Sequence, residues 1–498
     1  MQFFNHYAEQ LSDIVSDVAI APLQGARVAY INQQLADELS LPESMRNQDD
    51  LLSALFAASE EKNNQSSLAN LLNKKVIAQK YGGHQFGHWN PDLGDGRGVL
   101  LAEYKAPDGQ LWDLHLKGAG VTPYSRNGDG RAVLRSTIRE FLACEALHAM
   151  GIPSSRALCL ITSQEPVQRE RLEPGAMMIR MAHSHIRFGH FEYFYHSGQH
   201  DKLQALFDFT FQHHFPHLIN EPDKYYQLLR QIVVDTASLI AKWQAQGFNH
   251  GVMNTDNMSI HGITFDFGPY AFLDDFQSNY ICNHSDYNGR YAFDQQPGIG
   301  LWNLNALAHA FSSHLDIEQI RDALQQYEAV LHKEYRFLIA KKMGFIESTD
   351  DDKHEDGQLV NDWLMQLDKE KRDYHLSFRY LSEVVTGSNQ DQRNQKLRDH
   401  FIDQVWISQW LNKYISRVSK QSLNDVERHK EMLKVNPIYV LRNHLAQKVI
   451  EDAYRDNFDT FELLLDALRS PFTAQDKYSA FAKPPPDEHK GIALSCSS

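Results

Sequence analysis

The sequence predicts an α+β protein of two lobes, a β-rich one followed by a helical one, with further helical elements at both ends. Short strand-like runs gather between about residues 100 and 181, and the pattern turns helical from Leu203 onward. The 498 residues, 42% of them hydrophobic, suffice for a large core. We expect an N-terminal extension over 1–75, a β-rich N-lobe over 76–200, a helical C-lobe over 201–345 and a C-terminal helical region with a cysteine-containing tail over 346–498.

The composition argues against several classes of partner. The formal net charge of −15 opposes binding to a polyanion, so no nucleic-acid partner is expected. The first residues have no basic stretch followed by an apolar one, and no apolar run of about 18 residues follows, so we expect neither export nor a membrane. Four cysteines without a C-x-x-C pair favour a reducing cytosol over a disulfide scaffold or a zinc ribbon, and hence a cytoplasmic protein.

A β-hairpin and a helix are expected at the centre of the N-lobe. Leu101–Lys105 and Leu111–Lys117 alternate apolar and polar residues around the turn Pro107-Asp108-Gly109. Residues 131–150 have apolar positions at helical spacing, with Gly151 just beyond their end. Lys117 therefore ends a strand, and Glu140 lies in the middle of the following helix.

Lys117 and Glu140 together have the layout of a kinase lysine and its helix glutamate. Lys117 is followed by Gly118-Ala119-Gly120 and then by the helix that carries Glu140. The alternative is an exposed lysine and an exposed helical glutamate. The motifs further along the chain decide between the two interpretations.

The strongest motif is a loop followed by a metal-binding sequence. His250-Gly251-Val252-Met253-Asn254-Thr255-Asp256-Asn257 is followed, after a predicted short hairpin around Ile260, by Phe265-Asp266-Phe267-Gly268. This order is typical of a kinase catalytic loop and its D-F-G sequence, in which Asn257 and Asp266 offer hard oxygen ligands to Mg²⁺ or Mn²⁺. The sequence thus predicts a protein-kinase-like nucleotide site.

One departure from the kinase pattern concerns the catalytic base. The position two residues after the loop histidine, where a phosphotransferase has its aspartate, is Val252. Asp256 is the carboxylate left in the loop to accept a hydroxyl proton. The alternative is that Asp256 caps a helix or a turn.

Other segments could contact phosphates. Gly94-Asp95-Gly96-Arg97-Gly98 lets backbone amides approach an anion, although a plain flexible turn is the alternative, and the chain has neither a Walker A nor a dinucleotide fingerprint. Asp129 and Gly130 precede the expected helix, where Asp129 would cap the helix or contact a ribose or phosphate. Arg180 and Arg187 are candidate phosphate ligands, or else surface and salt-bridge residues.

Histidines are frequent between residues 183 and 217. Their spacing is irregular and no H-E-x-x-H occurs, so we interpret them as partly buried polar residues rather than metal ligands. The stretch contains His183, His190, His196, His213, His214 and His217.

The motifs together resemble those of the selenoprotein O family, a kinase-like group of pseudokinases that adenylylate proteins. The resemblance covers most of the chain and is weaker in the first 75 residues. It is carried by Y-G-G-H-Q-F-G from Tyr81, L-G-D-G-R-G from Leu93, H-L-K-G-A-G from His115, N-T-D-N-M from Asn254, F-D-F-G-P-Y from Phe265 and N-P-I-Y-V-L-R-N from Asn436.

This resemblance implies an activity and a role for each candidate residue. ATP would lie flipped relative to an ordinary kinase, so that AMP passes to Ser, Thr or Tyr hydroxyls of proteins and pyrophosphate leaves. The resemblance leaves open UMP transfer from UTP and implies a role in redox homeostasis. Asp256 would be the proton acceptor, Glu140 would orient Lys117, and Asn257 and Asp266 would bind Mg²⁺ or Mn²⁺. The nucleotide would contact Gly94, Gly96, Arg97, Lys117, Asp129, Gly130, Arg180, Arg187 and Asp266.

Two cysteines suggest regulation. Eukaryotic members of the family have selenocysteine near the C-terminus, where this chain has Cys496, and Cys282 lies 16 residues after Asp266, where kinases have their activation loop. We expect that a disulfide between Cys282 and Cys496 switches activity; the alternative is a small buried residue and a free tail thiol. The two alternative functions are a phosphotransferase and an ATP-binding scaffold without turnover.

Overall fold

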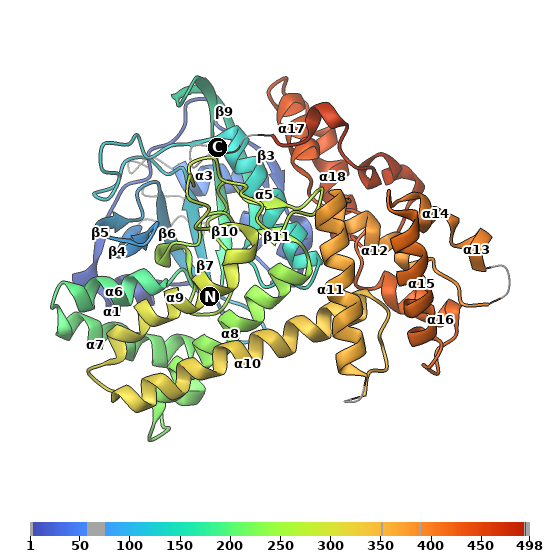
Figure 1. Cartoon of the computed structure of the whole chain (residues 1–498). Coiled ribbons are helices and arrows are strands. Elements are labelled where there is room, and N and C mark those ends of the chain that lie inside the picture. Colours follow the sequence, from blue (N-terminus) through green and yellow to red (C-terminus); the bar gives the residue numbers. More distant parts are fainter. Residues whose placement is uncertain (1–2, 57–74, 350–351, 388–389, 493, 495–498) are drawn as a thin grey trace.

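The computed structural model describes residues 3–56, 75–349, 352–387, 390–492 and 494. It is a mixed α/β structure built around a large antiparallel sheet with many helices, as the α+β prediction requires (Figure 1). In the described residues this sheet has ten strands, and its main path runs β2-β4-β6-β7-β10-β9-β3. β1 pairs with β6, β5 with β4, and β8 with β10.

The predicted hairpin is confirmed and lies at the middle of this sheet. β6 and β7 pair antiparallel, with Gly98 opposite Lys117, and β10 flanks β7 on its other side. The strands are β1 (Phe3–Phe4), β2 (Val15–Asp17), β3 (Arg27–Ile31), β4 (Ile77–Gln85), β5 (His88–Gly94), β6 (Gly98–Lys105), β7 (Leu111–Lys117), β8 (Ala132–Val133), β9 (Arg156–Gln168) and β10 (Leu172–Ala182), and a second, two-stranded sheet joins β11 (Phe248–Asn249) to β12 (Ala271–Phe272).

Helices cover both faces of the large sheet. On one face, Leu35 and Leu51 of the N-terminal helices share a core with Leu114 and Leu116 of β7. On the other face, Ile138 of the long helix after β8 belongs to the largest core. The helices concerned are α1 (His6–Gln10), α2 (Gln33–Glu38), α3 (Gln48–Phe56) and α5 (Leu134–Ala149). The boundary at residue 75 stays a prediction, but β1, β2 and β3 are built into the sheet.

The chain after the sheet is helical. α10 packs along α8 beneath the sheet, and both contribute to the largest core (Figure 1). The helices of this part are α6 (Phe188–His196), α7 (His200–Phe209), α8 (Lys224–Ala245), α9 (Gln296–Ala308) and α10 (Ile317–Lys342).

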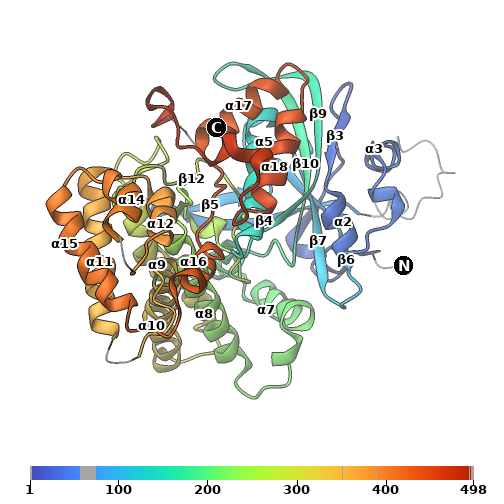
Figure 2. The same cartoon turned by 90° about the vertical axis from the view of Figure 1, so that its right-hand side faces the viewer.

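The C-terminal helices divide into two groups. Most of α11 to α16 share a core that contains Trp363 and Trp410 and also takes in Ile339 of α10 and Phe276 of the segment after the D-F-G sequence. α17 and α18 instead return to the sheet and pack against α5 (Figure 2). Their bounds are α11 (Lys353–Glu370), α12 (Tyr374–Ser382), α13 (Gln390–Arg393), α14 (Gln395–Asp399), α15 (Gln404–Val418), α16 (Asp425–Leu433), α17 (Asn443–Ala453) and α18 (Asp459–Arg469).

Two local predictions were wrong. The helix expected from Arg131 begins at Leu134, because Ala132 and Val133 pair with β10 as strand β8. The short hairpin expected before the D-F-G sequence does not form: Ser259 bridges to Arg187, and Thr264 bridges to Ser154. In both cases a distant segment supplies the backbone partners that the local sequence pattern cannot reveal.

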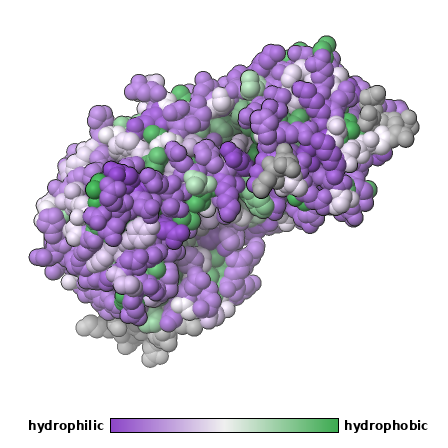
Figure 3. Space-filling model, turned by 60° about the horizontal axis from the view of Figure 1, so that its bottom comes forward, coloured by the Kyte–Doolittle hydropathy of each residue, from purple (hydrophilic) through white to green (hydrophobic). Residues whose placement is uncertain are grey.

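One face of the molecule is mostly hydrophilic. Figure 3 shows a face on which hydrophobic residues are scattered among hydrophilic ones. Among the helices of the described residues, none is both long enough and apolar enough to cross a bilayer.

Buried charges connect the C-terminal region to the segment after the D-F-G sequence. Arg442, at the end of the N-P-I-Y-V-L-R-N sequence, is 3% exposed and pairs with both Asp274 and Asp373, the latter at 2.9 Å. Burial raises the pKa of Asp274, and Arg442 acts against that rise. Arg442 therefore keeps two buried carboxylates compensated.

We expect Arg442→Met to lower the free energy of unfolding by about 3–5 kcal/mol, because it leaves two carboxylates without their cation in a buried place. Denaturant unfolding measures this change. The matched control is Arg455→Met, which removes an arginine whose side chain is 76% exposed and is expected to change little. Equal midpoints for the two variants would contradict the prediction.

Candidate active site

A cavity of about 580 Å³ opens between the sheet and the loops that follow β10 and β11. Such a volume is usual for a small-ligand site. Of the residues predicted for the site, Gly94, Gly96, Arg97, Lys117, Asp129, Gly130, Arg180, Arg187, Asp256, Asn257 and Asp266 line this cavity.

The register of the central strands places Lys117 beside Arg180. His115 and Lys117 lie two residues apart on β7, so their side chains share a face of the sheet. Arg180 of β10 stands directly opposite His115 and is thus the diagonal neighbour of Lys117. Both basic side chains point to the same carboxylate, that of Glu140 on α5.

Glu140 is fully buried and compensated by two cations. Lys117 donates to its Oε2, and Arg180 donates to its Oε1 at 3.0 Å. Burial acts to raise the pKa of Glu140, but Lys117 and Arg180 hold it below its ordinary value. Burial lowers the pKa of Lys117 to about 8, against the opposite effect of Glu140. The pair therefore stays ionised near pH 7.

Asp266 of the D-F-G sequence is held by two arginines. Arg180 donates to its Oδ1, and Arg187 donates to its Oδ2. Asp266 has a φ of +59°, a left-handed backbone conformation that aspartate tolerates better than most residues. Arg187, which precedes α6, also lies over the rings of Tyr81 and Phe265. Arg180 and Arg187 are therefore buried members of the site and not surface residues.

The glycine-rich segment joins β5 to β6 and is fixed at both ends. The carbonyl of Arg97 accepts hydrogen bonds from the amides of Gly118 at 2.6 Å and Ala119 at 3.2 Å. Asp95 turns inward, where its carboxylate accepts a hydrogen bond from the Gln79 amide at 3.0 Å. The segment is therefore an anchored loop at the wall of the cavity, and the flexible-turn alternative loses its basis.

Asp129 does not cap a helix, because α5 begins five residues later. Its carboxylate accepts the Arg131 amide at 2.9 Å and pairs with Arg169 at 2.8 Å. Burial acts to raise the pKa of Asp129, but the hydrogen bonds from Arg169 and the Arg131 amide lower it overall. Gly130, with a φ of +68°, lies against Gly120, where a side chain would meet the backbone at about 2.0 Å.

The predicted catalytic loop is tied to the D-F-G segment by its histidine. His250 accepts the Val252 amide at Nδ1 and donates from Nε2 to the carbonyl of Phe265 at 3.1 Å. Asn257 donates from its amide nitrogen to the carbonyl of Val252 at 2.9 Å. This use of the nitrogen leaves the amide oxygen of Asn257 as the acceptor atom of its side chain.

Asp256 is a buried carboxylate with one oxygen unused. Its Oδ2 accepts a hydrogen bond from Gln85 at 3.2 Å, while Oδ1 has no hydrogen-bond partner among the described residues. Burial raises the pKa of Asp256 to about 6, although Arg187 acts to lower it. A carboxyl that titrates near neutrality suits proton transfer.

The Y-G-G-H-Q-F-G sequence explains how β4 reaches this loop. A Cβ at Gly83 would lie 2.8 Å from Oδ1 of Asp256, so only glycine lets the strand approach so closely. Next to it, the His84 amide donates to Oγ1 of Thr255 at 2.7 Å. The end of β4 thus forms one wall around Asp256.

The cavity is cationic although the chain carries a charge of −15. Seven Lys or Arg residues line it against four Asp residues, and this excess favours a polyphosphate ligand. Three of the arginines, Arg126, Arg131 and Arg169, were not identified from the sequence. Arg126 and Arg131 flank the N-G-D-G sequence, and this position could have identified them from the sequence. Arg169 lies 40 residues from Asp129, and no sequence pattern connects the two.

The structure describes only one of the two cysteines that are predicted to form a disulfide. Cys282 is buried, and its Sγ lies 3.7 Å from the carbonyl of Asn249. Cys496 lies outside the described residues. Leu494, two positions before it, pairs with Asn283, and its carbonyl accepts the His284 amide at 2.8 Å.

The site therefore contains the groups that a nucleotide-dependent transferase requires. These are buried cationic side chains suited to phosphates, oxygen donors suited to a metal ion, and a carboxylate of raised pKa. The family model described as Protein adenylyltransferase SelO matches residues 1–469. The chain belongs to this family.

Curated relatives agree with this assignment. A protein of Pseudoalteromonas atlantica is 54% identical over 498 residues, covering all of both chains. A protein of Yersinia pseudotuberculosis is 46% identical over 497 residues, covering 100% of this chain and 99% of the relative. A third, from Klebsiella pneumoniae, is 46% identical over 498 residues and covers both chains completely. All three are named "Protein nucleotidyltransferase YdiU".

Proposed function

We propose that this protein adenylyltransferase binds ATP in the cationic cavity and transfers AMP to Ser, Thr or Tyr hydroxyls of other proteins. Membership of the adenylyltransferase family and the names of the relatives support transfer of a nucleotide to protein. The observation that carries the site assignment is the convergence of Lys117, Asn257 and Asp266, predicted from three separate motifs, on one cavity.

The fold we propose is that of a protein kinase with two lobes. Three arrangements support it: a strand lysine paired with a helix glutamate, a loop histidine bound to the D-F-G segment, and a small sheet of β11 and β12 around the loop. The large sheet with α5 would be the N-lobe, and the helices from α6 onward would begin the C-lobe.

The basic residues of the cavity would bind the phosphates. Lys117, Arg180 and Arg187 are buried at the cavity, where the carboxylates of Glu140 and Asp266 hold their side chains in place. Glu140 would orient Lys117. The segments around the glycines would contact the nucleotide through Gly94, Gly96, Arg97, Asp129 and Gly130.

Asn257 and Asp266 would hold Mg²⁺ or Mn²⁺. Their donors are an amide oxygen and a carboxylate, the hard ligands that these ions prefer, and both residues line the cavity. The amide nitrogen of Asn257 is bound to Val252, which orients the oxygen for this use. When bound, such an ion neutralises charge that develops on the phosphates.

Asp256 would accept the proton of the acceptor hydroxyl. The hydroxyl oxygen forms a bond to the α-phosphorus of ATP, the bond from that phosphorus to the β-phosphate oxygen breaks, and pyrophosphate leaves. The Asp256 carboxylate lines the cavity, and the hydrogen bond from Gln85 to its Oδ2 fixes the side chain in the cavity wall.

An ordinary phosphotransferase is less well supported, because Val252 occupies the position of the kinase base and carries no proton acceptor. The family resemblance implies a flipped ATP, with its α-phosphate toward the acceptor, and we propose this orientation here. A scaffold without turnover would not need the raised pKa of Asp256. UTP would be tolerated as a second donor to the extent that the cavity contacts the phosphates rather than the base.

The decisive experiment labels a protein acceptor with ATP carrying its isotope on either the α- or the γ-phosphate. Label is expected from α-labelled ATP and not from γ-labelled ATP, and transfer is expected to require the divalent ion. Asp266→Asn should abolish this transfer without changing the circular dichroism spectrum. Transfer of γ-label would identify a kinase, and no transfer of either label would identify a scaffold.

We expect Asp256→Ala to slow AMP transfer about 10²- to 10⁴-fold with nearly unchanged affinity for ATP. In the parent protein the rate should rise with pH as Asp256 loses its proton, because only the carboxylate accepts the proton of the hydroxyl. The pKa of about 6 is an upper limit for this midpoint, since a nearby divalent ion favours the ionised form. A loss of affinity without a loss of rate would make Asp256 a binding residue.

We further propose that Cys282 and Cys496 form a regulatory disulfide. The pairing of Leu494 beside Cys282 supports it, because it brings the end of the described chain next to this cysteine. Oxidised glutathione would take up the two electrons and two protons that the thiols lose. In the reducing cytosol favoured by the sequence such a bond would be intermittent.

Oxidised glutathione is expected to change the rate of AMP transfer by the parent protein, and dithiothreitol should restore it. Cys282→Ser and Cys496→Ser should each remove this response. Cys159→Ser, at a buried position on β9, should keep it. Peptide mapping without reductant identifies the linked pair. A redox response that survives in Cys496→Ser would exclude the switch.

A further inference from the structure

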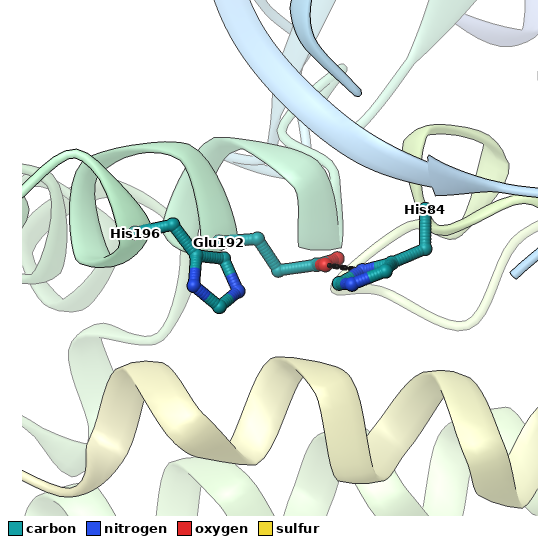
Figure 4. Close-up of side chains that lie close together, drawn as sticks. All are labelled: His84, Glu192 and His196. Carbon is teal, nitrogen blue, oxygen red and sulfur yellow. Dashed lines mark hydrogen bonds and ion pairs between the residues drawn. The ribbon is translucent and has the colours of Figure 1, made fainter. Parts of the chain in front are cut away.

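Three side chains outside the cavity form a cluster of metal-binding type. They are His84 at the end of β4, and Glu192 and His196 on α6 (Figure 4). Glu192 and His196 are four residues apart and therefore lie on one face of the helix. One ligand atom from each of the three residues lies within 4.8 Å of the other two. None of the three residues lines the nucleotide cavity.

Glu192 is the buried member that lacks compensation. Its side chain is 0% exposed, and Oε2 accepts a hydrogen bond from Nδ1 of His84 at 2.5 Å. Its other oxygen, Oε1, has no hydrogen-bond partner among the described residues, and no Lys or Arg of the described chain forms an ion pair with it. Leaving a buried carboxylate oxygen unpaired is costly, so a cation is expected there.

The donor set indicates which cation. Two imidazoles and one carboxylate are the ligands of many zinc sites, and they suit other borderline transition metals as well. Mg²⁺ prefers oxygen ligands and keeps several waters, so it does not fit this set. Three protein ligands leave one position of a tetrahedral ion for water.

The surroundings of the cluster favour a defined site. The ring of Trp89 contacts both histidines, with its centroid 5.2 Å from that of His84 and 4.6 Å from that of His196. Trp302 of α9 packs edge-on against His84. Aromatic walls on two sides limit the access of water and restrict the movement of the His84 ring.

We propose that His84, Glu192 and His196 form a second metal site, specific for Zn²⁺ or a similar transition-metal ion and separate from the nucleotide's metal. Such an ion ties the end of β4 to α6. The same end of β4 contacts the catalytic loop, through the His84 amide on Thr255 and the Phe86 amide on Oδ1 of Asn254 at 3.3 Å. The ion therefore holds the wall around Asp256 in place.

A simpler explanation is that His84 and Glu192 form an ion pair and nothing more. That explanation gives His196 no role, and its side chain is exposed at the end of α6. If that explanation holds, the parent protein should bind no metal ion at this cluster, and replacing His196 should change nothing. Because this side chain is exposed, we expect His196→Ala to leave folding intact, which makes it the informative variant.

The test is a titration of chelator-treated full-length protein with Co²⁺, followed by the visible d–d absorption of the ion. We expect one equivalent to bind with the intense spectrum of a low-coordinate site, to be displaced by Zn²⁺ and to resist excess Mg²⁺. His196→Ala and the isosteric Glu192→Gln should each weaken Co²⁺ binding at least about 10-fold. Zn²⁺ should raise the Tm of the parent protein and not that of His196→Ala.

Two controls separate this site from its neighbours. His309→Ala removes an exposed histidine that stacks on Tyr195 near the cluster, and Asp266→Asn removes the predicted nucleotide metal ligand. Both should bind Co²⁺ as the parent protein does. The proposal is overturned if the parent protein gives no such spectrum, if His196→Ala keeps it, or if Asp266→Asn abolishes it. None of these results depends on AMP transfer, so failure of the proposed function would be recognised separately.

Discussion

The interaction on which the site depends is the pairing of the Asp266 carboxylate with Arg180 and Arg187. Buried charges are tolerated only when they are paired, and here Arg180 also compensates Glu140, which in turn holds Lys117. This chain of ion pairs joins β7, α5, β10 and the start of α6 to the D-F-G segment. Removing one member would leave its partners uncompensated, so the geometry of the cavity is determined collectively rather than residue by residue.

The same network resolves an apparent conflict in the electrostatics. The chain as a whole is acidic, yet the cavity has more basic than acidic residues, and a cleft of one sign focuses the field on its ligand. The arginines are fixed by carboxylates before any ligand arrives. An incoming triphosphate would therefore meet donors that are already oriented, which lowers the cost of reorganisation.

Strand β4 has two roles that belong together. Its glycines allow the close approach to Asp256, and its last residues hold the predicted catalytic loop through hydrogen bonds. The proposed metal site would fasten this strand to α6 from the opposite side. The raised pKa of Asp256 arises mainly from burial by such neighbours, so the position of β4 and the chemistry of Asp256 are coupled.

The sequence by itself determined the hairpin of β6 and β7, the mixed α/β class, and the candidate residues Lys117, Glu140, Asp256, Asn257 and Asp266, because these follow from local periodicity and from motifs of fixed spacing. Tertiary structure decided which hydrogen bonds and ion pairs form between segments that are distant in the sequence. Strand β8 displaced the first turn of the expected helix, since β10 offered backbone partners, and Arg169 reached Asp129 from a separate hairpin. The cluster of His84, Glu192 and His196 was not found from sequence patterns for the same reason: His84 is over 100 residues away from Glu192 and His196, and only folding brings the three together.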